Sequence, residues 1–186
     1  MKRIFDLLLG IVVFMLLATV ILLVAIAVRL SSKGPVLYWS DRIGKDNETF
    51  KMPKFRSMLS GTPTVATHLL ENPEAYLSPI GGFLRSTSLD ELPQLFSVLR
   101  GDMSFVGPRP ALFNQDDLIA LRKEKGIDKL LPGITGWAQV NGRDILIVTD
   151  KVDLDEVYMQ RQSFWFDMKI LWMTFLKVIK RDGVSH

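Results

Sequence analysis

A run of 22 residues without a charged side chain, Leu7 to Val28, constrains the fold of this chain more than any other feature. As a helix it would be about 33 Å long, which is enough to cross the hydrocarbon core of a bilayer. A signal peptide does not fit, because the run is too long and no small-residue cleavage pattern follows it. A buried core helix fits less well, since such helices rarely lack a polar face over about six turns. We therefore expect a membrane helix within residues 1–30, followed by one domain over residues 31–186.

Basic residues lie on both sides of this run, at Lys2, Arg3, Arg29 and Lys33, so charge does not select one orientation. They fit a hairpin that enters and leaves through one face of the membrane. A hairpin needs a break, however, and no proline lies between residues 1 and 34, where Gly10 is the only strong helix weakener. On these grounds alone a straight span is slightly favoured.

The composition limits the partners of this chain and the side chains that can act as nucleophile or general base. The net charge of +3 suits an anionic partner such as a lipid headgroup or a nucleotide. No nucleic-acid-binding motif is present, so nucleic acid is not expected as a partner. The chain has no cysteine, and its two histidines, His68 and His186, lie in a polar loop and at the terminus. Acid–base and nucleophilic work therefore falls to carboxylates.

The remaining pattern predicts an α+β fold: a mainly helical small domain with short strands. Strands are expected at residues 36–39 and 49–52, around a polar turn at residues 44–47. Residues 60–80 should form a loop with a short helix, and the glycine-rich segment 131–143 should be largely loop. Helices are expected over residues 89–99, 115–125, 150–160 and 164–179.

The last of these helices is rich in Trp and Phe, contains Lys169 and Lys177, and is followed directly by Lys180 and Arg181. A basic amphipathic helix of this kind can lie in the membrane interface, where each cation near an anionic surface contributes about 1 kcal/mol. A C-terminal core helix whose lysines extend to solvent explains the same pattern equally well. Both interpretations stay open at this point.

Two adjacent carboxylates, Asp90 and Glu91, are the strongest candidates for chemistry. The plainer interpretation is helix capping, because Ser88 to Glu91 matches S-x-x-E and acids are favoured in a first helical turn. The functional interpretation places Asp90 at the positive end of a helix, where it stays ionised and attacks phosphorus as a nucleophile. The second acid would then hold a divalent cation or handle the proton of the acceptor.

Three arginines are candidates for phosphate binding, namely Arg56, Arg85 and Arg109. Arg109 is the best of them, since Pro108 and Pro110 fix the backbone on both sides and reduce the entropy lost in a bidentate phosphate contact. Each of the others, considered alone, fits an ordinary solvated side chain.

Two further residues are weaker candidates. Arg143 follows a series of glycines that could form a second cradle, for a base or a sugar, although no Walker or dinucleotide pattern is present. Asp155 is expected on a solvated helix face unless the fold brings it back to Asp90.

Taken together, these segments resemble the bacterial sugar transferases, the small monotopic phosphoglycosyl transferases that act on polyprenol phosphate. The segments that carry the resemblance occur in the order of that family and together are highly specific. They are Lys54-Phe55-Arg56-Ser57-Met58, Arg85-Ser86-Thr87-Ser88-Leu89-Asp90-Glu91-Leu92-Pro93-Gln94, Gly101-Asp102-Met103-Ser104-Phe105-Val106-Gly107-Pro108-Arg109-Pro110, Pro132-Gly133-Ile134-Thr135-Gly136 and Gln139-Val140-Asn141-Gly142-Arg143.

The resemblance implies a reaction. A UDP-sugar would donate its phosphosugar to a polyprenol phosphate, typically undecaprenyl phosphate, with release of UMP. It makes Asp90 the nucleophile, through a covalent aspartyl-phosphosugar intermediate, and gives Glu91 a role in assisting the acceptor or holding Mg²⁺. The expected magnesium ligands are therefore Asp90 and Glu91, since charge on a diphosphate must be neutralised during transfer. The resemblance also places Arg56, Arg85, Arg109 and Asp155 at positions that look like active-site positions of the family.

The resemblance further implies a re-entrant N-terminal helix and interfacial amphipathic helices on the cytoplasmic face of the bacterial inner membrane, in contact with membrane lipids. This reverses the preference for a span. Close relatives carry a Ser-Pro pair at the break, where this chain has Ala18-Thr19, and Thr19 can bend a helix only slightly.

Two hypotheses compete with this interpretation. The first keeps the same enzyme but transfers the group directly, without a covalent intermediate, and the second is a membrane-anchored nucleotide-sugar-binding scaffold subunit without turnover. Candidate protein partners are a second copy of the chain and downstream glycosyltransferases.

Overall fold

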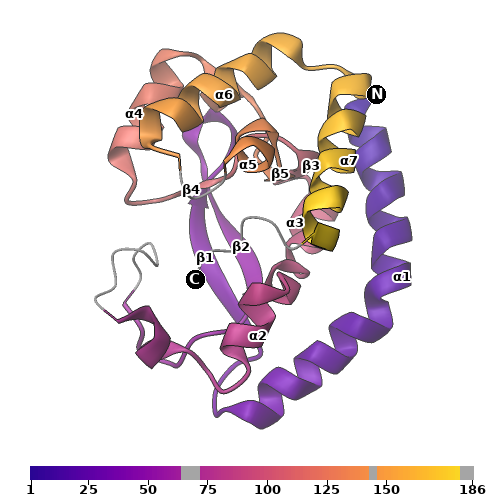
Figure 1. Cartoon of the computed structure of the whole chain (residues 1–186), viewed down its shortest axis with the longest axis vertical. Coiled ribbons are helices and arrows are strands. Elements are labelled where there is room, and N and C mark those ends of the chain that lie inside the picture. The colour runs from indigo at the N-terminus through magenta and orange to yellow at the C-terminus, as the bar shows by residue number, and fades with distance from the viewer. Residues whose placement is uncertain (64–71, 143–145, 181–186) are drawn as a thin grey trace.

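A computed structural model describes residues 1–63, 72–142 and 146–180 of the chain. The N-terminal apolar run forms part of one unbroken helix, α1 (Lys2–Ser31), which is long and apolar enough to cross a membrane. Figure 1 shows α1 along one side of the molecule, with an axis that changes direction in its C-terminal half. The expected apolar helix is confirmed, and its path is bent without a break.

The first sheet is built on a hairpin of β1 (Leu37–Ile43) and β2 (Thr49–Phe55), which pair antiparallel. The turn between them contains Asp46 and Asn47 at φ of 57° and 60°, a left-handed region that these two residue types tolerate better than most. A short strand, β4 (Ala111–Leu112), pairs with the other edge of β1 and gives the order β2-β1-β4. The expected strands are confirmed, and each extends beyond its expected range.

A second sheet joins β3 (Ser104–Val106) to β5 (Gly133–Thr135) in parallel. Here the expectation of a glycine-rich loop over residues 131–143 is partly wrong, because β5 and then α5 (Trp137–Asn141) occupy much of it. The glycines serve close backbone packing. A Cβ on Gly133 would come within 2.1 Å of the nitrogen of Gly107, so only glycine permits this approach.

The remaining helices surround these sheets (Figure 1). They are α2 (Gly81–Ser86), α3 (Gln94–Arg100), α4 (Asp116–Glu124), α6 (Val148–Arg161) and α7 (Phe164–Lys180), with short 3₁₀ turns η1 (Lys45–Asn47), η3 (Pro73–Tyr76), η4 (Leu89–Glu91) and η5 (Ile127–Lys129). The helices expected near residues 115–125, 150–160 and 164–179 are confirmed.

The helix expected over residues 89–99 starts later than expected. Residues 89–91 form the separate turn η4, and α3 begins only after Pro93. Ser88 has a left-handed φ of 56° and its side chain makes no capping hydrogen bond. The capping box suggested by the S-x-x-E pattern is therefore absent, so helix capping does not explain the presence of Asp90 and Glu91.

The helix α1 contributes to two hydrophobic clusters of the same domain. Leu9 and Val13 pack against a cluster that contains Met52 of β2. Val24 and Val28 belong to a cluster with Phe55, also of β2. Both halves of α1 therefore pack along one domain, and its other face leaves a row of large apolar side chains exposed, at Ile4, Leu8, Ile11, Val12, Met15, Leu16, Leu22, Leu23, Ile26 and Leu30.

The C-terminal helix α7 also has two different faces. Asp167 and Ile170 are buried against the domain, whereas Trp165 is 79% exposed and Trp172 is 60% exposed. The start of α7 lies beside the start of α1, where the rings of Phe5 and Phe164 are 5.4 Å apart (Figure 1). The helix thus packs on the core with one face and presents aromatic side chains with the other.

Candidate functional site

The two acids of η4 lie in a turn that packs against α1. Leu89 and Leu92, which flank them, pack against the cluster that contains Val24 and Val28 of α1. These apolar contacts fix the backbone of the turn. Asp90 is only 8% exposed, which is unusual for an aspartate and indicates a role other than solvation.

Glu91 is held between two cations that come from different parts of the chain. Lys54 Nζ on β2 donates to Glu91 Oε1 at 2.8 Å, and Arg109 Nη2 donates to the same oxygen at 3.0 Å. The Glu91 side chain is 15% exposed, so burial alone would raise its pKa. The two cations and their hydrogen bonds prevail and hold the pKa of Glu91 well below its ordinary value of 4.5. Glu91 is therefore a fixed anion at neutral pH.

Asp90 has a different electrostatic balance from its neighbour. Burial raises the pKa of the Asp90 carboxyl above its ordinary value, and the negative charge of Glu91 adds to this effect. Lys54, Arg85 and Arg109 act in the opposite direction, without cancelling it. The site thus disfavours the ionised form of Asp90. Formation of a bond from its carboxylate oxygen to an electrophile, or contact with a further cation, would remove this unfavourable charge.

This balance predicts an effect on stability. Above pH 3.8 the Asp90 carboxyl ionises in the unfolded chain, while the fold resists its ionisation, so stability falls as pH rises through the raised pKa of the folded state. We expect Asp90→Asn to raise the melting temperature at pH 7, and the gain should vanish below pH 3.8, where the carboxyl is protonated in both states. Thermal unfolding of the two proteins in nanodiscs at both pH values measures this. A melting temperature lowered at pH 7 would contradict it.

Cations gather around the acid pair. Arg85 and Arg109, both expected from the sequence, are near enough to Asp90 to lower its pKa. Arg42 of β1 was not expected: burial and the charge of Arg109 lower its pKa to about 10, against a raising effect of Glu91. With Lys54, four cations therefore surround two carboxylates. The positive excess is complementary to a diphosphate.

Arg56 occupies a different position. It is buried, and its guanidinium donates to the carbonyl oxygens of Ser32 and Lys33 at 2.8 and 2.6 Å. Arg56 thereby fixes the linker that leaves α1. Its expected role in phosphate binding stays a prediction.

Asp155 is fully buried on α6, so the alternative of a solvated helix face is wrong. Its Oδ2 accepts from Arg122 on α4, and Arg122 also donates to the carbonyl of Arg109. Asp155 therefore reaches the candidate site through Arg122, and its expected direct contact with substrate stays a prediction. Arg143, the other weak candidate, lies outside the described residues.

The donor set suits magnesium better than a softer metal. Among the described residues, no group of three or more His, Cys, Asp or Glu side chains is arranged to hold a metal by itself. Magnesium commonly uses one or two carboxylates together with the phosphates of its substrate. The adjacent carboxylates Asp90 and Glu91 fit that pattern, and a cation would also offset the buried charge of Asp90.

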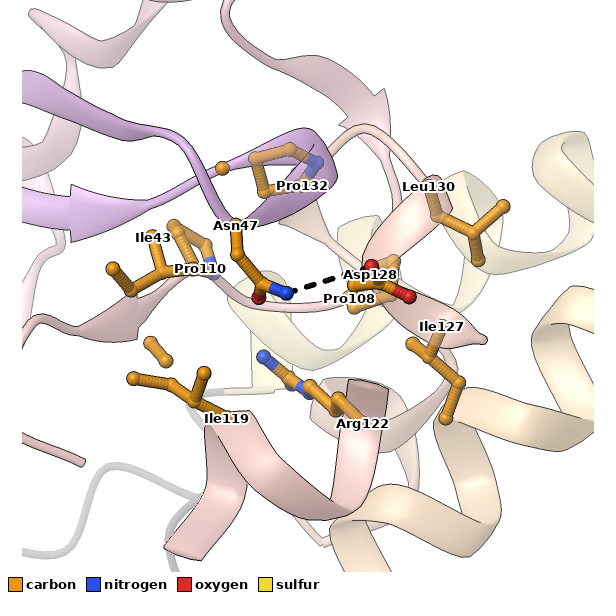
Figure 2. A pocket seen from close by; sticks show the side chains of 12 residues that line it. Ile43, Asn47, Pro108, Pro110, Ile119, Arg122, Ile127, Asp128, Leu130 and Pro132 are labelled. Carbon is orange, nitrogen blue, oxygen red and sulfur yellow. Dashed lines mark hydrogen bonds between the residues drawn. The ribbon is translucent and has the colours of Figure 1, made fainter. Parts of the chain in front are cut away.

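A small cavity lies behind the Pro108–Pro110 loop. Its volume is about 30 Å³, and its lining includes Pro108, Pro110 and Arg122, whose side chains point toward it (Figure 2). That volume holds about one or two water molecules and is too small for a sugar nucleotide. The cavity therefore borders the loop, and its volume does not match the size expected of a substrate pocket.

Comparisons with known proteins agree with this arrangement. A sequence model described as "Bacterial sugar transferase" matches residues 1–181. The chain is 39% identical over 188 residues to "Uncharacterized sugar transferase EpsL" of Bacillus subtilis, a match that covers 100% of this chain and 91% of that protein.

Two longer relatives have names that specify a reaction. The chain is 41% identical over 185 residues to the Escherichia coli "UDP-glucose:undecaprenyl-phosphate glucose-1-phosphate transferase", covering 95% of this chain and 40% of that protein. It is 34% identical over 201 residues to "Undecaprenyl-phosphate galactose phosphotransferase" of Salmonella typhimurium, covering 98% of this chain and 41% of that protein. The chain thus spans less than half the length of these two relatives.

Proposed function

Since this chain belongs to the bacterial sugar transferase family, we propose that it moves a sugar phosphate from a UDP-sugar to undecaprenyl phosphate and releases UMP. The names of two longer relatives, which specify glucose and galactose phosphates, support this choice of substrates. The observation that carries the proposal is the buried Asp90 beside Glu91, surrounded by cations from several elements. Such a site binds a diphosphate and presents a nucleophile to it.

The proposed reaction has two displacements at phosphorus. A carboxylate oxygen of Asp90 attacks the phosphorus that bears the sugar, the bond from that phosphorus to the bridging oxygen breaks, and UMP leaves with the electron pair. The phosphate oxygen of undecaprenyl phosphate then attacks the same phosphorus and displaces the Asp90 carboxylate. The products are undecaprenyl-diphospho-sugar, UMP and the unchanged enzyme.

The neighbouring side chains prepare this chemistry. Lys54 and Arg109 hold Glu91 in one place and also balance the charge that develops on the transferring phosphoryl group. Magnesium, bound by Asp90 and Glu91 together with the diphosphate, would supply charge neutralisation for the leaving UMP. Arg85 is near enough to Asp90 to bind phosphate oxygens of the same substrate.

The packing of α1 supports a monotopic arrangement, and the side that we propose is the cytoplasmic face of the inner membrane. A straight span would leave the domain, which packs along both halves of α1, beside the helix and inside the hydrocarbon. Burying charges such as Lys54 and Glu91 there is prohibitively costly. In the proposed arrangement α1 enters with its exposed apolar face and returns to the same side through its bend (Figure 1), without a break in the helix, and the exposed aromatics of α7 lie in the interface.

This topology predicts the outcome of a labelling experiment. The native chain has no cysteine, so single cysteines report without interference. We expect a cysteine inserted between Met1 and Lys2 and a cysteine in Lys33→Cys to react with a membrane-impermeant maleimide from the same side of sealed vesicles. Labelling from opposite sides would replace the hairpin with a span.

The proposed activity is tested by measuring UMP release from a panel of UDP-sugars with magnesium, with and without undecaprenyl phosphate. We expect release with at least one donor. Binding of a UDP-sugar with no UMP from any donor would instead support the scaffold alternative. A second copy of the chain and downstream glycosyltransferases stay predicted protein partners.

A further inference from the structure

The guanidinium of Arg122 links a buried carboxylate to the backbone of the Pro108–Pro110 loop. Its Nε and Nη2 donate to Asp155 Oδ2 at 3.0 and 2.6 Å, and its Nη1 donates to the carbonyl oxygen of Arg109 at 2.8 Å. The Arg122 side chain is 12% exposed and Asp155 is fully buried. All three nitrogens are thus engaged within the protein, which suits orientation of the loop better than capture of a ligand.

A second arginine holds the next carbonyl of the same loop. Arg42 on β1 donates from Nη1 to the carbonyl oxygen of Pro110 at 3.2 Å, and from Nε to Ser40 Oγ at 3.0 Å. Two guanidiniums from different elements therefore bind consecutive carbonyls, those of Arg109 and Pro110. The flanking prolines already restrict the backbone, and these bonds fix its position in space.

Few other groups can replace Arg122 behind the loop. The cavity there is lined mainly by apolar side chains, and its other polar side chains, Asn47 and Asp128, are directed to each other at 3.5 Å (Figure 2). Without the Arg122 guanidinium, the carbonyl of Arg109 would lose this side-chain donor. The carbonyls on either side have donors of their own, Gly133 N for Pro108 and Arg42 for Pro110, so the restraint lost would be the one on Arg109 itself.

We propose that Arg122, oriented by Asp155, is a positioning residue that sets Arg109 against Glu91. The contacts run without interruption from Asp155 to Arg122, to the backbone of Arg109, and from the Arg109 side chain to Glu91 Oε1 at 3.0 Å. The kinetic consequence rests on the proposed function, because Arg109 then binds the diphosphate in a fixed position. Neither Arg122 nor Asp155 needs to touch the substrate.

The test replaces the ion pair as a unit, because removing one partner would leave a buried charge. Arg122→Gln/Asp155→Asn is compared with Lys125→Gln. Lys125, the C-cap residue of α4, joins that helix to α6 through Asp153 and Glu156, and neither of these ion pairs involves the loop. Hydrogen–deuterium exchange of residues 105–114 in the full chain in nanodiscs should rise in the first variant only. Equal exchange in the two variants would overturn the proposal.

Kinetics provide the second arm. We expect kcat/KM for UMP release to fall about a hundredfold in Arg122→Gln/Asp155→Asn, since a displacement of about 1 Å is enough for such a loss. Lys125→Gln should stay within about twofold of wild type. In an Arg109→Ala background, the same double substitution should cost less than about threefold, because its target is already gone.

The outcomes of these experiments separate a failure of the positioning role of Arg122 from a failure of the proposed function. An undiminished hundredfold loss in the Arg109→Ala background would mean that the pair acts independently of Arg109, and would overturn the positioning role. A wild-type protein that releases no UMP from any donor would refute the proposed function alone. In that case the exchange comparison still decides whether Arg122 restrains the loop.

Discussion

Replacing Asp90 with asparagine should abolish UMP release from the UDP-sugar that the wild type uses, with a loss of more than about a thousandfold in kcat. Asparagine preserves the shape of the side chain but cannot act as the anionic nucleophile. Because the fold resists ionisation of the Asp90 carboxyl, the variant should remain folded at pH 7. The loss is measured as initial rates of UMP formation at saturating donor, with and without undecaprenyl phosphate.

The matched control is Asp153→Asn, which removes an exposed carboxylate that pairs with Lys125 on the surface. It should keep UMP release within about twofold of wild type, as expected for a surface ion pair. Turnover by Asp90→Asn at the rate of this control would exclude Asp90 as the nucleophile.

Replacing Lys54 with methionine should reduce kcat/KM about a hundredfold and move the acid limb of the pH–rate profile to higher pH. Lys54 donates to Glu91 at 2.8 Å and is the strongest cationic influence on its pKa. Without Lys54 the pKa of Glu91 rises, so Glu91 becomes protonated at a pH where the wild-type residue is still an anion. Lys54 also lowers the pKa of the nucleophile Asp90, so its loss raises the pKa of both carboxyls and moves the acid limb in the same direction.

The sign of the accompanying stability change follows from the same shift. A carboxyl with a depressed pKa contributes stability above its unfolded value, and that contribution disappears as pH falls through the folded value. The Lys54→Met variant should therefore be less stable than wild type at pH 7. Lys51→Met is the control, since Lys51 lies on the same strand and pairs with Asp41 in an exposed position. An acid limb that moves equally in both variants would contradict the role of Lys54.

Much of the fold could be predicted from local pattern. The apolar run of α1, the alternating strands of the hairpin, and the periodic helices α4, α6 and α7 all carry signals within a single window of sequence. The wrong secondary-structure predictions concern places where the backbone of one segment packs closely against that of another or adopts an unusual turn. Gly133 looked like loop punctuation, although it permits close packing of β5 against Gly107. The acids at residues 90 and 91 looked like a helix cap, although Ser88 adopts a left-handed turn instead.

The candidate site could be predicted only in part, for a related reason. Asp90, Glu91 and Arg109 lie in short, distinctive segments, so the sequence pointed to them directly. Arg42 and Arg122 are single cations without a motif, and their roles depend on β1 and α4 meeting the Pro108–Pro110 loop. Lys54 was visible in its segment, but its contact with Glu91 crosses 37 positions in the chain. Such tertiary contacts leave no local periodicity.

Whether Asp90 carries the phosphosugar during transfer can be determined from the intact mass of the protein after reaction with its UDP-sugar in the absence of undecaprenyl phosphate. We expect the wild type to gain the mass of one phosphosugar, a gain that is absent from Asp90→Asn and is removed when undecaprenyl phosphate is added. A wild-type protein that stays unmodified, yet forms the lipid product as soon as acceptor is supplied, would contradict this role of Asp90 and establish direct transfer.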